Sequence, residues 1–174
     1  MTHDELALKI YNVSHLTGEF KLRSGQISNE YFDKYQFESR PEILKEIAKQ
    51  LAPLIPSDTE VLAGLEMGGL PIATALSLET GLPVCFVRKT AKEYGTCLFA
   101  EGADIKNKKV CVIEDVITSG GQVIISTQDL RSMQAQIHTV ICVINRGGDE
   151  ALQKLKAIHL DVKSLFVRSD FPTN

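Results

Sequence analysis

The stretch that decides the fold is VCVIEDVITSGGQV, residues 110–123. Its opening run, Val110 to Ile113, is short, apolar and rich in β-branched residues, which is typical of a parallel strand buried on both faces. The acids Glu114 and Asp115 follow, and Thr118-Ser119-Gly120-Gly121 then stands where the next helix is expected to begin. Backbone amides at a helix N-terminus, together with the helix dipole, suit a phosphate. The stretch therefore predicts a strand, a phosphate loop and a helix in succession.

The two acids beside this loop indicate what kind of phosphate compound binds. Two carboxylates would repel a free phosphate, but they accept hydrogen bonds from the neighbouring hydroxyls of a ribose. A solvent-facing acid pair followed by an ordinary helix cap is the alternative. The whole string, however, resembles the signature with which phosphoribosyltransferases bind phosphoribosyl pyrophosphate. It favours a site in which the loop holds the 5-phosphate while Glu114 and Asp115 hold the ribose hydroxyls.

Length and composition set the class of protein. With 174 residues we expect a single domain, 1–174, made of an N-terminal helix and hood strands in 1–40 and an α/β core in 41–174. The net charge of -3 gives no general surface for nucleic acid. Neither a membrane-length apolar run nor a signal peptide is apparent, and the scattered cysteines form no C-x-x-C pair. We therefore expect a cytoplasmic protein that binds neither nucleic acid nor membrane.

The region before the core carries its own pattern. Leu6 and Ile10 share one face at helical spacing, so the chain is expected to open with a short helix. Residues 18–37 suggest two extended segments joined by a turn at Ser24-Gly25. A second helix is predicted to start at Pro41, which is well suited to the first helical position.

From Val61 onward, apolar runs alternate with helical patterns. The predicted strands are VLAGLE (61–66), PVCFVR (83–88), KVCVIED (109–115), HTVICVIN (138–145) and VKSLFV (162–167). The predicted helices span 71–78, 120–133 and 150–157, and a polar loop spans 90–102. Such alternation predicts a Rossmann-like α/β fold with a central, mostly parallel sheet flanked by helices. The carboxyl ends of its strands should share the edge where ligands bind.

Three further strand ends carry candidate binding residues at that edge. The glycines of Glu66-Met67-Gly68-Gly69 would let the backbone approach a pyrophosphate, although Gly-Gly is also common in turns. Arg88, Lys89 and Lys92 place three positive charges on the long polar loop, where they could form a lid or simply a solvated surface. The third segment, Asn145 to Gly148, begins at the last residue of the predicted strand 138–145.

Taken in order, these motifs resemble the orotate phosphoribosyltransferases over nearly the whole chain. The basic loop resembles the R-K-x-x-K-x-H-G loop of that family, with F-x-L-x-S-G before it and Asn-Arg-Gly-Gly after it. The resemblance implies a type I phosphoribosyltransferase, a pentosyl-transferring glycosyltransferase of pyrimidine (UMP) biosynthesis. Such enzymes move the ribose 5-phosphate of phosphoribosyl pyrophosphate to N1 of orotate, giving orotidine 5′-monophosphate and pyrophosphate. They use Mg²⁺ and act as cytoplasmic homodimers in which the basic loop closes over the partner's site.

The resemblance also implies roles for individual residues. The catalytic group would be Lys92, Glu114 and Asp115. Phosphoribosyl pyrophosphate would be bound by Arg23, Arg88, Lys89, Lys92, Tyr94, Glu114, Asp115, Val116, Ile117, Thr118, Ser119, Gly120, Gly121 and Gln122. The pyrophosphate loop would be Glu66, Met67, Gly68 and Gly69, and orotate would be bound by Tyr31, Phe32, Thr118 and Arg146. No residue would ligate a metal directly, because Mg²⁺ would be carried by the phosphoribosyl pyrophosphate.

Two positions depart from the family's usual pattern. Arg23 stands where Lys is common before Ser-Gly, and Tyr94 stands where the loop usually has His. Arg23 keeps the charge, but Tyr94 does not titrate near neutral pH as His does, which bears on any general-acid role. The sequence therefore leaves open transfer to another base, a purine or uracil. It also leaves open a regulator that binds phosphoribosyl pyrophosphate without turnover.

Overall fold

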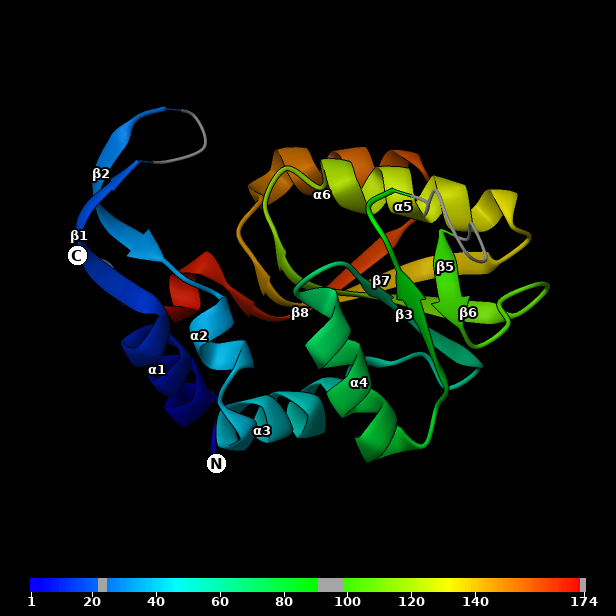
Figure 1. Cartoon of the computed structure of the whole chain (residues 1–174), viewed down its shortest axis with the longest axis horizontal. Coiled ribbons are helices and arrows are strands. Elements are labelled where there is room, and N and C mark those ends of the chain that lie inside the picture. Colours follow the sequence, from blue (N-terminus) through cyan, green and yellow to red (C-terminus); the bar gives the residue numbers. More distant parts are fainter. Residues whose placement is uncertain (22–24, 91–98, 173–174) are drawn as a thin grey trace.

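A computed structural model describes residues 1–21, 25–90 and 99–172 of the chain (Figure 1). The strands are β1 (His15–Lys21), β2 (Ile27–Phe32), β3 (Val61–Leu65), β4 (Val84–Val87), β5 (Ala100–Gly102), β6 (Lys109–Ile117), β7 (Gln136–Asn145) and β8 (Asp161–Val167). The helices are α1 (His3–Ser14), α2 (Tyr35–Glu38), α3 (Pro41–Leu51), α4 (Gly69–Thr80), α5 (Gly121–Ser132) and α6 (Gly148–Ala157), with 3-10 turns η1 (Ala52–Leu54) and η2 (Arg168–Asp170). No helix in these ranges is both long and apolar enough to cross a membrane.

The central sheet has the order β5-β4-β3-β6-β7-β8. Its strands run parallel except β5, which pairs antiparallel with β4. In Figure 1, α5 and α6 cover one face of this sheet, while α3 and α4 lie on the other. The predicted class, a mostly parallel sheet flanked by helices, is confirmed.

Strand β6 lies at the centre of the sheet and shows why its sequence is an apolar run. Val110 and Val112 pack with Val123 and Leu155 of the helices on one face. The alternate residues, Cys111 and Ile113, belong to the cluster on the opposite face, with α3 and α4. Because successive side chains of a strand point to opposite faces, a strand covered on both sides is apolar throughout.

The N-terminal hood packs against the same hydrophobic core as α3 and α4. Helix α1 starts with a capping box between Thr2 and Glu5, and its Leu6 and Ile10 are completely buried. Strands β1 and β2 form an antiparallel pair that stands apart from the central sheet in Figure 1. The predicted opening helix, the two extended segments and the helix that begins at Pro41 are all confirmed.

The structure corrects the predicted elements at three points. The polar loop predicted over 90–102 ends in strand β5, and helix α2 was not predicted at all. Strand β6, which was predicted to end with the acids Glu114 and Asp115, continues for two more residues to Ile117. Elements of three or four residues, such as β5 and α2, carry too little periodic pattern to be recognised from sequence.

One close contact between β3 and α4 gives a stability prediction. A Cβ added at Gly64 would lie 2.8 Å from Ala73 Cβ and 2.9 Å from Gly69 O, which are main-chain or rigid atoms of α4. Gly64→Ala must therefore push α4 away from the sheet, and we expect it to lower the free energy of unfolding by about 2–3 kcal/mol. Denaturant unfolding followed by circular dichroism measures this loss.

Gly121→Ala is the matched control for that experiment. A Cβ at Gly121 would meet only Ser119 Oγ, at an ordinary contact distance of 3.7 Å. Its unfolding midpoint should stay near that of the wild type. Equal midpoints for the two variants would contradict the close packing of β3 against α4.

Candidate active site

The predicted site segments meet at the carboxyl edge of the sheet. The backbone amide of Lys89 donates to Glu66 Oε2 at 3.0 Å, which joins the loops after β3 and β4. The backbone amide of Arg146 donates to Ile117 O at 2.8 Å, which joins β7 to the end of β6. Glycines bring the backbones closer still, since a Cβ at Gly147 would overlap the carbonyl oxygen of Thr118. Segments far apart in sequence thus form one continuous edge.

The phosphate loop has the geometry expected from its sequence. Gly120 adopts φ 74°, a left-handed conformation that favours glycine, and caps the N-terminus of α5. Thr118 and Ser119 are exposed just before it. The first amides of α5 have no acceptor within the helix and, with the helix dipole, can bind an anion.

The pyrophosphate loop lies beside it, after β3. Met67 is 53% exposed, and the peptide bond between Glu66 and Met67 is cis. Gly69 starts α4 so close to β6 that a Cβ there would overlap Ile113 O. This contact places the loop directly against the strand that carries the acid pair.

The two basic residues described near this loop differ in their surroundings. Arg88 is held by Glu101 of β5, whose Oε2 accepts from Arg88 Nη2 at 3.1 Å and Nε at 3.2 Å. Lys89 is exposed next to the pyrophosphate loop. Arg23, Lys92 and Tyr94, which were also predicted to bind phosphoribosyl pyrophosphate, lie outside the described residues.

Of the acid pair, Asp115 is completely buried and Glu114 is 8% exposed. Lys34, which precedes α2, lies over Asp115, with Nζ 2.5 Å from Oδ2. Asp115 Oδ1 accepts from the amide of Val116, and Glu114 Oε1 accepts from the amide of Asp115 at 3.0 Å. The Lys34 side chain is 34% exposed, so it covers the buried Asp115 from the solvent side.

A third acid, Glu38 of α2, completes the cluster. It is 7% exposed, and its Oε1 has no hydrogen-bond partner among the described residues. Gly68 packs against both acids: a Cβ there would overlap Asp115 Oδ2 and lie 2.8 Å from Glu38 Oε1. Neither Lys34 nor Glu38 was predicted from the sequence, because they lie at the two ends of the unrecognised helix α2 and carry no motif of their own.

Burial and mutual repulsion set the charges of this cluster. Burial, and next the facing Asp115, raise the pKa of Glu38 to about 9. Burial and Asp115 likewise raise the pKa of Glu114 well above its usual value. Burial would also raise the pKa of Asp115, but hydrogen bonds from Glu114 and Lys34 and the charge of Lys34 outweigh it and lower that pKa. With a pKa of about 9, Glu38 is protonated at neutral pH, whereas Asp115, which is paired with Lys34, is ionised.

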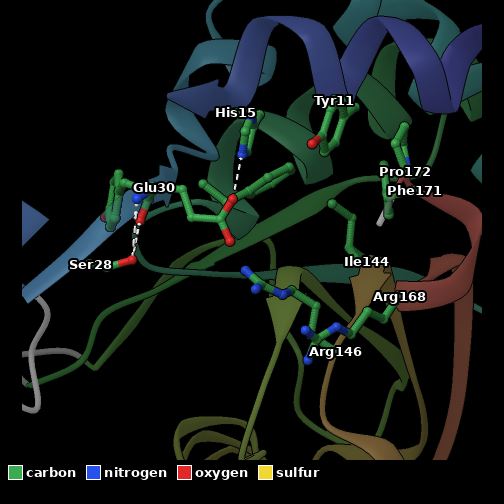
Figure 2. Close-up of a pocket in the computed structure, with 11 residues that line it drawn as sticks. Tyr11, His15, Ser28, Glu30, Ile144, Arg146, Arg168, Phe171 and Pro172 are labelled. Carbon is green, nitrogen blue, oxygen red and sulfur yellow. Dashed lines mark hydrogen bonds and ion pairs between the residues drawn. The ribbon is translucent and has the colours of Figure 1, made fainter. Parts of the chain in front are cut away.

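The base would enter a pocket of about 430 Å³ between the hood and the sheet edge (Figure 2). Two predicted residues, Tyr31 and Phe32, line it from β2, and the guanidinium of Arg146 lies 5.6 Å from the centre of the Phe32 ring. Thr118 is near, because the loop that carries Arg146 packs on its carbonyl. The predicted aromatic residues and arginine are thus brought together.

The pocket also contains residues that the sequence did not indicate. Figure 2 shows Tyr11, His15 and Glu30 on the hood side, facing Arg146 and Arg168 on the side of the sheet. His15 Nε2 lies 2.8 Å from Glu30 Oε2. These residues come from α1, β1, β2 and η2, so no local pattern could have joined them.

A fit test for Mg²⁺ rests on the donors present. The described ranges hold no group of three or more His, Cys, Asp or Glu side chains arranged to bind a metal ion. Of the site's two acids on β6, Asp115 is engaged by Lys34. This donor set suits a cation that arrives with the substrate's phosphates better than one held by the protein.

Comparison with known proteins gives a consistent result. A family model described as the phosphoribosyl transferase domain matches residues 35–168. The chain is 46% identical over 167 residues to an orotate phosphoribosyltransferase of Nocardioides sp., covering 95% of this chain and 92% of the relative. It is 40% identical over 139 residues to an orotate phosphoribosyltransferase of Methanocaldococcus jannaschii, covering 79% of each. Mycobacterium tuberculosis orotate phosphoribosyltransferase, solved with Fe(III) dicitrate, has a TM-score of 0.86 at 26% identity, covering 97% of both chains.

The protonation of Glu38 predicts a pH dependence of stability. Between its ordinary pKa of 4.5 and about 9, the unfolded chain has released this proton while the folded chain keeps it. The free energy of unfolding should therefore fall as pH rises through this range, by up to about 1.4 kcal/mol per pH unit for this group. Glu38→Gln should remove that slope, as measured by urea unfolding at a series of pH values.

The exposed Glu42 of α3 provides the control. Glu42→Gln should retain the pH dependence of the wild type. Parallel stability profiles for the wild type and Glu38→Gln would show that Glu38 is ionised in the folded protein.

Proposed function

The chain belongs to the phosphoribosyltransferase family, and we propose that it transfers ribose 5-phosphate from phosphoribosyl pyrophosphate to orotate. The products are orotidine 5′-monophosphate and pyrophosphate, in the de novo synthesis of pyrimidines. The observation that carries the choice of base is the position of Arg146 over Phe32 in the pocket next to the phosphate loop. An aromatic ring and a guanidinium match a planar base that bears a carboxylate.

The donor would lie along the carboxyl edge of the sheet. Thr118 to Gln122 would bind the 5-phosphate at the N-terminus of α5. Glu114 and Asp115 would bind the ribose hydroxyls, with Val116 and Ile117 supplying the backbone between. The pyrophosphate would lie against residues 66–69, with Arg88, Lys89 and, from the undescribed part of the chain, Arg23, Lys92 and Tyr94 around it.

The reaction needs no protein nucleophile. The bond from the ribose C1 to the pyrophosphate oxygen breaks, and the pyrophosphate leaves with the electron pair. The bond from C1 to orotate N1 forms, and the proton of N1 is released, either to the departing pyrophosphate or to water. Positive charge develops on the ribose as the bond breaks, and the ionised Asp115 with its neighbour Glu114 favours it. Arg146 and the phosphate loop hold base and donor in line, which lowers the entropic part of the barrier.

Mg²⁺ belongs to this proposal as a companion of the pyrophosphate. When bound, it would neutralise part of the leaving group's charge. Residues Arg88 and Lys89 would add to that neutralisation from the protein. The orientation of the pyrophosphate would be the task of the 66–69 loop.

The proposal also covers organisation and location. Leu6 and Ile10 of the hood share one core with Ile113 of the sheet, which supports a single domain over 1–174. Cys85, Cys111 and Cys142 are buried free thiols, as is usual in the reducing cytoplasm. The proposal includes a homodimer with shared sites, as the family resemblance implies, and Leu78 of α4, which is 87% exposed, is the residue that we propose for the contact between copies.

Orotate consumption tests the function directly. Purified protein with phosphoribosyl pyrophosphate and Mg²⁺ should cause the absorbance of orotate to fall while pyrophosphate is released. In a panel of bases, use of adenine, guanine, hypoxanthine or uracil in place of orotate would identify a different acceptor. Binding of phosphoribosyl pyrophosphate without release of pyrophosphate would identify a regulator.

Arg146→Ala tests the choice of base. Losing a charge-assisted contact with the orotate carboxylate should raise the KM for orotate roughly tenfold to a hundredfold, or about 1.5–3 kcal/mol. The KM for phosphoribosyl pyrophosphate should change little. Arg40→Ala, which removes an exposed arginine before α3, is the control. An unchanged KM for orotate in Arg146→Ala would remove Arg146 from the base site.

Leu78→Glu tests the dimer. A charge introduced at an apolar contact between copies should convert the dimer to a monomer in sedimentation velocity and lower turnover, because the sites are shared. Leu8→Glu alters another exposed leucine, 52% exposed on α1, and should leave the dimer intact. A wild-type chain that sediments as a monomer would refute the shared site.

A further inference from the structure

The three-acid cluster contains a residue whose place the transfer reaction alone does not explain. Glu38 is 7% exposed on the four-residue helix α2, which packs between α1 and α3, well before the strand that carries the acid pair. Its Oε1 has no hydrogen-bond partner among the described residues. A buried oxygen without a donor is costly, so its position calls for a specific reason.

That reason lies in what faces Glu38. Asp115 Oδ2 and Glu38 Oε1 both lie within 2.8 Å of the position that a Cβ on Gly68 would take. Two carboxylates so placed cannot both be ionised, and the single ammonium of Lys34 compensates only Asp115. A proton on Glu38 turns a repulsive pair into a hydrogen bond, with Glu38 as donor and Asp115 as acceptor.

The two donors that face Asp115 differ in mobility. Lys34 lies at the end of a long side chain that is 34% exposed, and it covers the carboxylate in the ligand-free protein. Glu38 is enclosed in the core beside Phe37, which is completely buried. If a ribose hydroxyl takes the place of Lys34, the amide of Val116 still donates to Asp115 Oδ1, and Glu38 is the side-chain donor that remains near Oδ2.

We propose that Glu38, in its neutral form, is a positioning residue that holds the Asp115 carboxylate in place for the ribose of phosphoribosyl pyrophosphate. The inference rests on the proposed function, because Asp115 acts there as the acceptor for a ribose hydroxyl. Glu38 itself touches no substrate. Its hydrogen bond fixes the orientation of Asp115 in both the empty and the occupied site.

Two variants of similar size separate hydrogen bonding from packing. Glu38→Gln keeps a donor at the same place, whereas Glu38→Met keeps the volume without the donor. Glu38→Gln should bind phosphoribosyl pyrophosphate with Mg²⁺ within about threefold of the wild type in calorimetry, whereas Glu38→Met should bind at least about tenfold more weakly. The KM for orotate should be unchanged in both, because the base pocket is separate. Glu42→Met, on the exposed face of α3, is the control.

The pH dependence of the affinity for phosphoribosyl pyrophosphate adds a measurement that a purely structural role of Glu38 would not affect. Glu38 faces Asp115 and Glu114 from β6 and Lys34 and Tyr35 from its own segment, and its pKa is raised to about 9. Above that pH the wild type should lose affinity for phosphoribosyl pyrophosphate relative to Glu38→Gln, so the ratio of the two affinities should change. This comparison of wild type with Glu38→Gln also tests the role of Glu38 if Glu38→Met does not fold.

The outcomes separate this inference from the proposed function. Wild-type affinity in a folded Glu38→Met, or an affinity ratio of Glu38→Gln to wild type that stays constant up to pH 10, overturns the role of Glu38. A wild-type protein that binds phosphoribosyl pyrophosphate but consumes no orotate overturns the proposed acceptor alone. The affinities of Glu38→Gln and Glu38→Met for phosphoribosyl pyrophosphate then still test the role of Glu38. A wild-type protein that binds no phosphoribosyl pyrophosphate overturns both.

Discussion

The close approach of backbone segments at the carboxyl edge of the sheet is the constraint on which the site depends. A Cβ at Gly69 would overlap Ile113 O, and one at Gly147 would overlap Thr118 O. Main-chain atoms on both sides of such contacts cannot turn away as a side chain can, so these positions must stay glycine. The loops after β3 and β7 are thereby fixed against β6, so the residues that we propose for pyrophosphate, ribose phosphate and base lie along the same edge of the sheet.

The balance of charge within this edge resolves a conflict that the sequence raised. Two acids beside a phosphate loop would repel an anionic substrate if both were ionised. In the structure Asp115 keeps its charge under Lys34, while burial keeps Glu38 protonated and raises the pKa of Glu114. The protonation of Glu38 and the pairing of Asp115 with Lys34 reduce the negative charge of the cluster, and the exposed Lys89 lies next to residues 66–69.

The parts of the fold that were predictable have strong local patterns. Strands β3, β6 and β7 are apolar runs, and α3 shows helical spacing that begins at a proline, so their type and order followed from the sequence. Strand β6 runs two residues beyond its predicted end at Asp115, because Val116 and Ile117 pair with Ile144 and Asn145 of β7, and such a pairing is not visible in the local sequence. In the site, the phosphate loop and Arg146 were predicted, whereas the partners of Asp115 were not.

The sequence by itself determined the strand, loop and helix of residues 110–123, because a phosphate loop needs only contiguous residues with the right conformational freedom. It also determined the parallel sheet, because the pattern that buries both faces of a strand is local. Only the tertiary structure decided that Lys34 and Glu38 meet Asp115, and that Tyr11, His15 and Arg168 share a pocket with Arg146. Burial and charge compensation depend on neighbours brought from distant parts of the chain, and no local pattern encodes them.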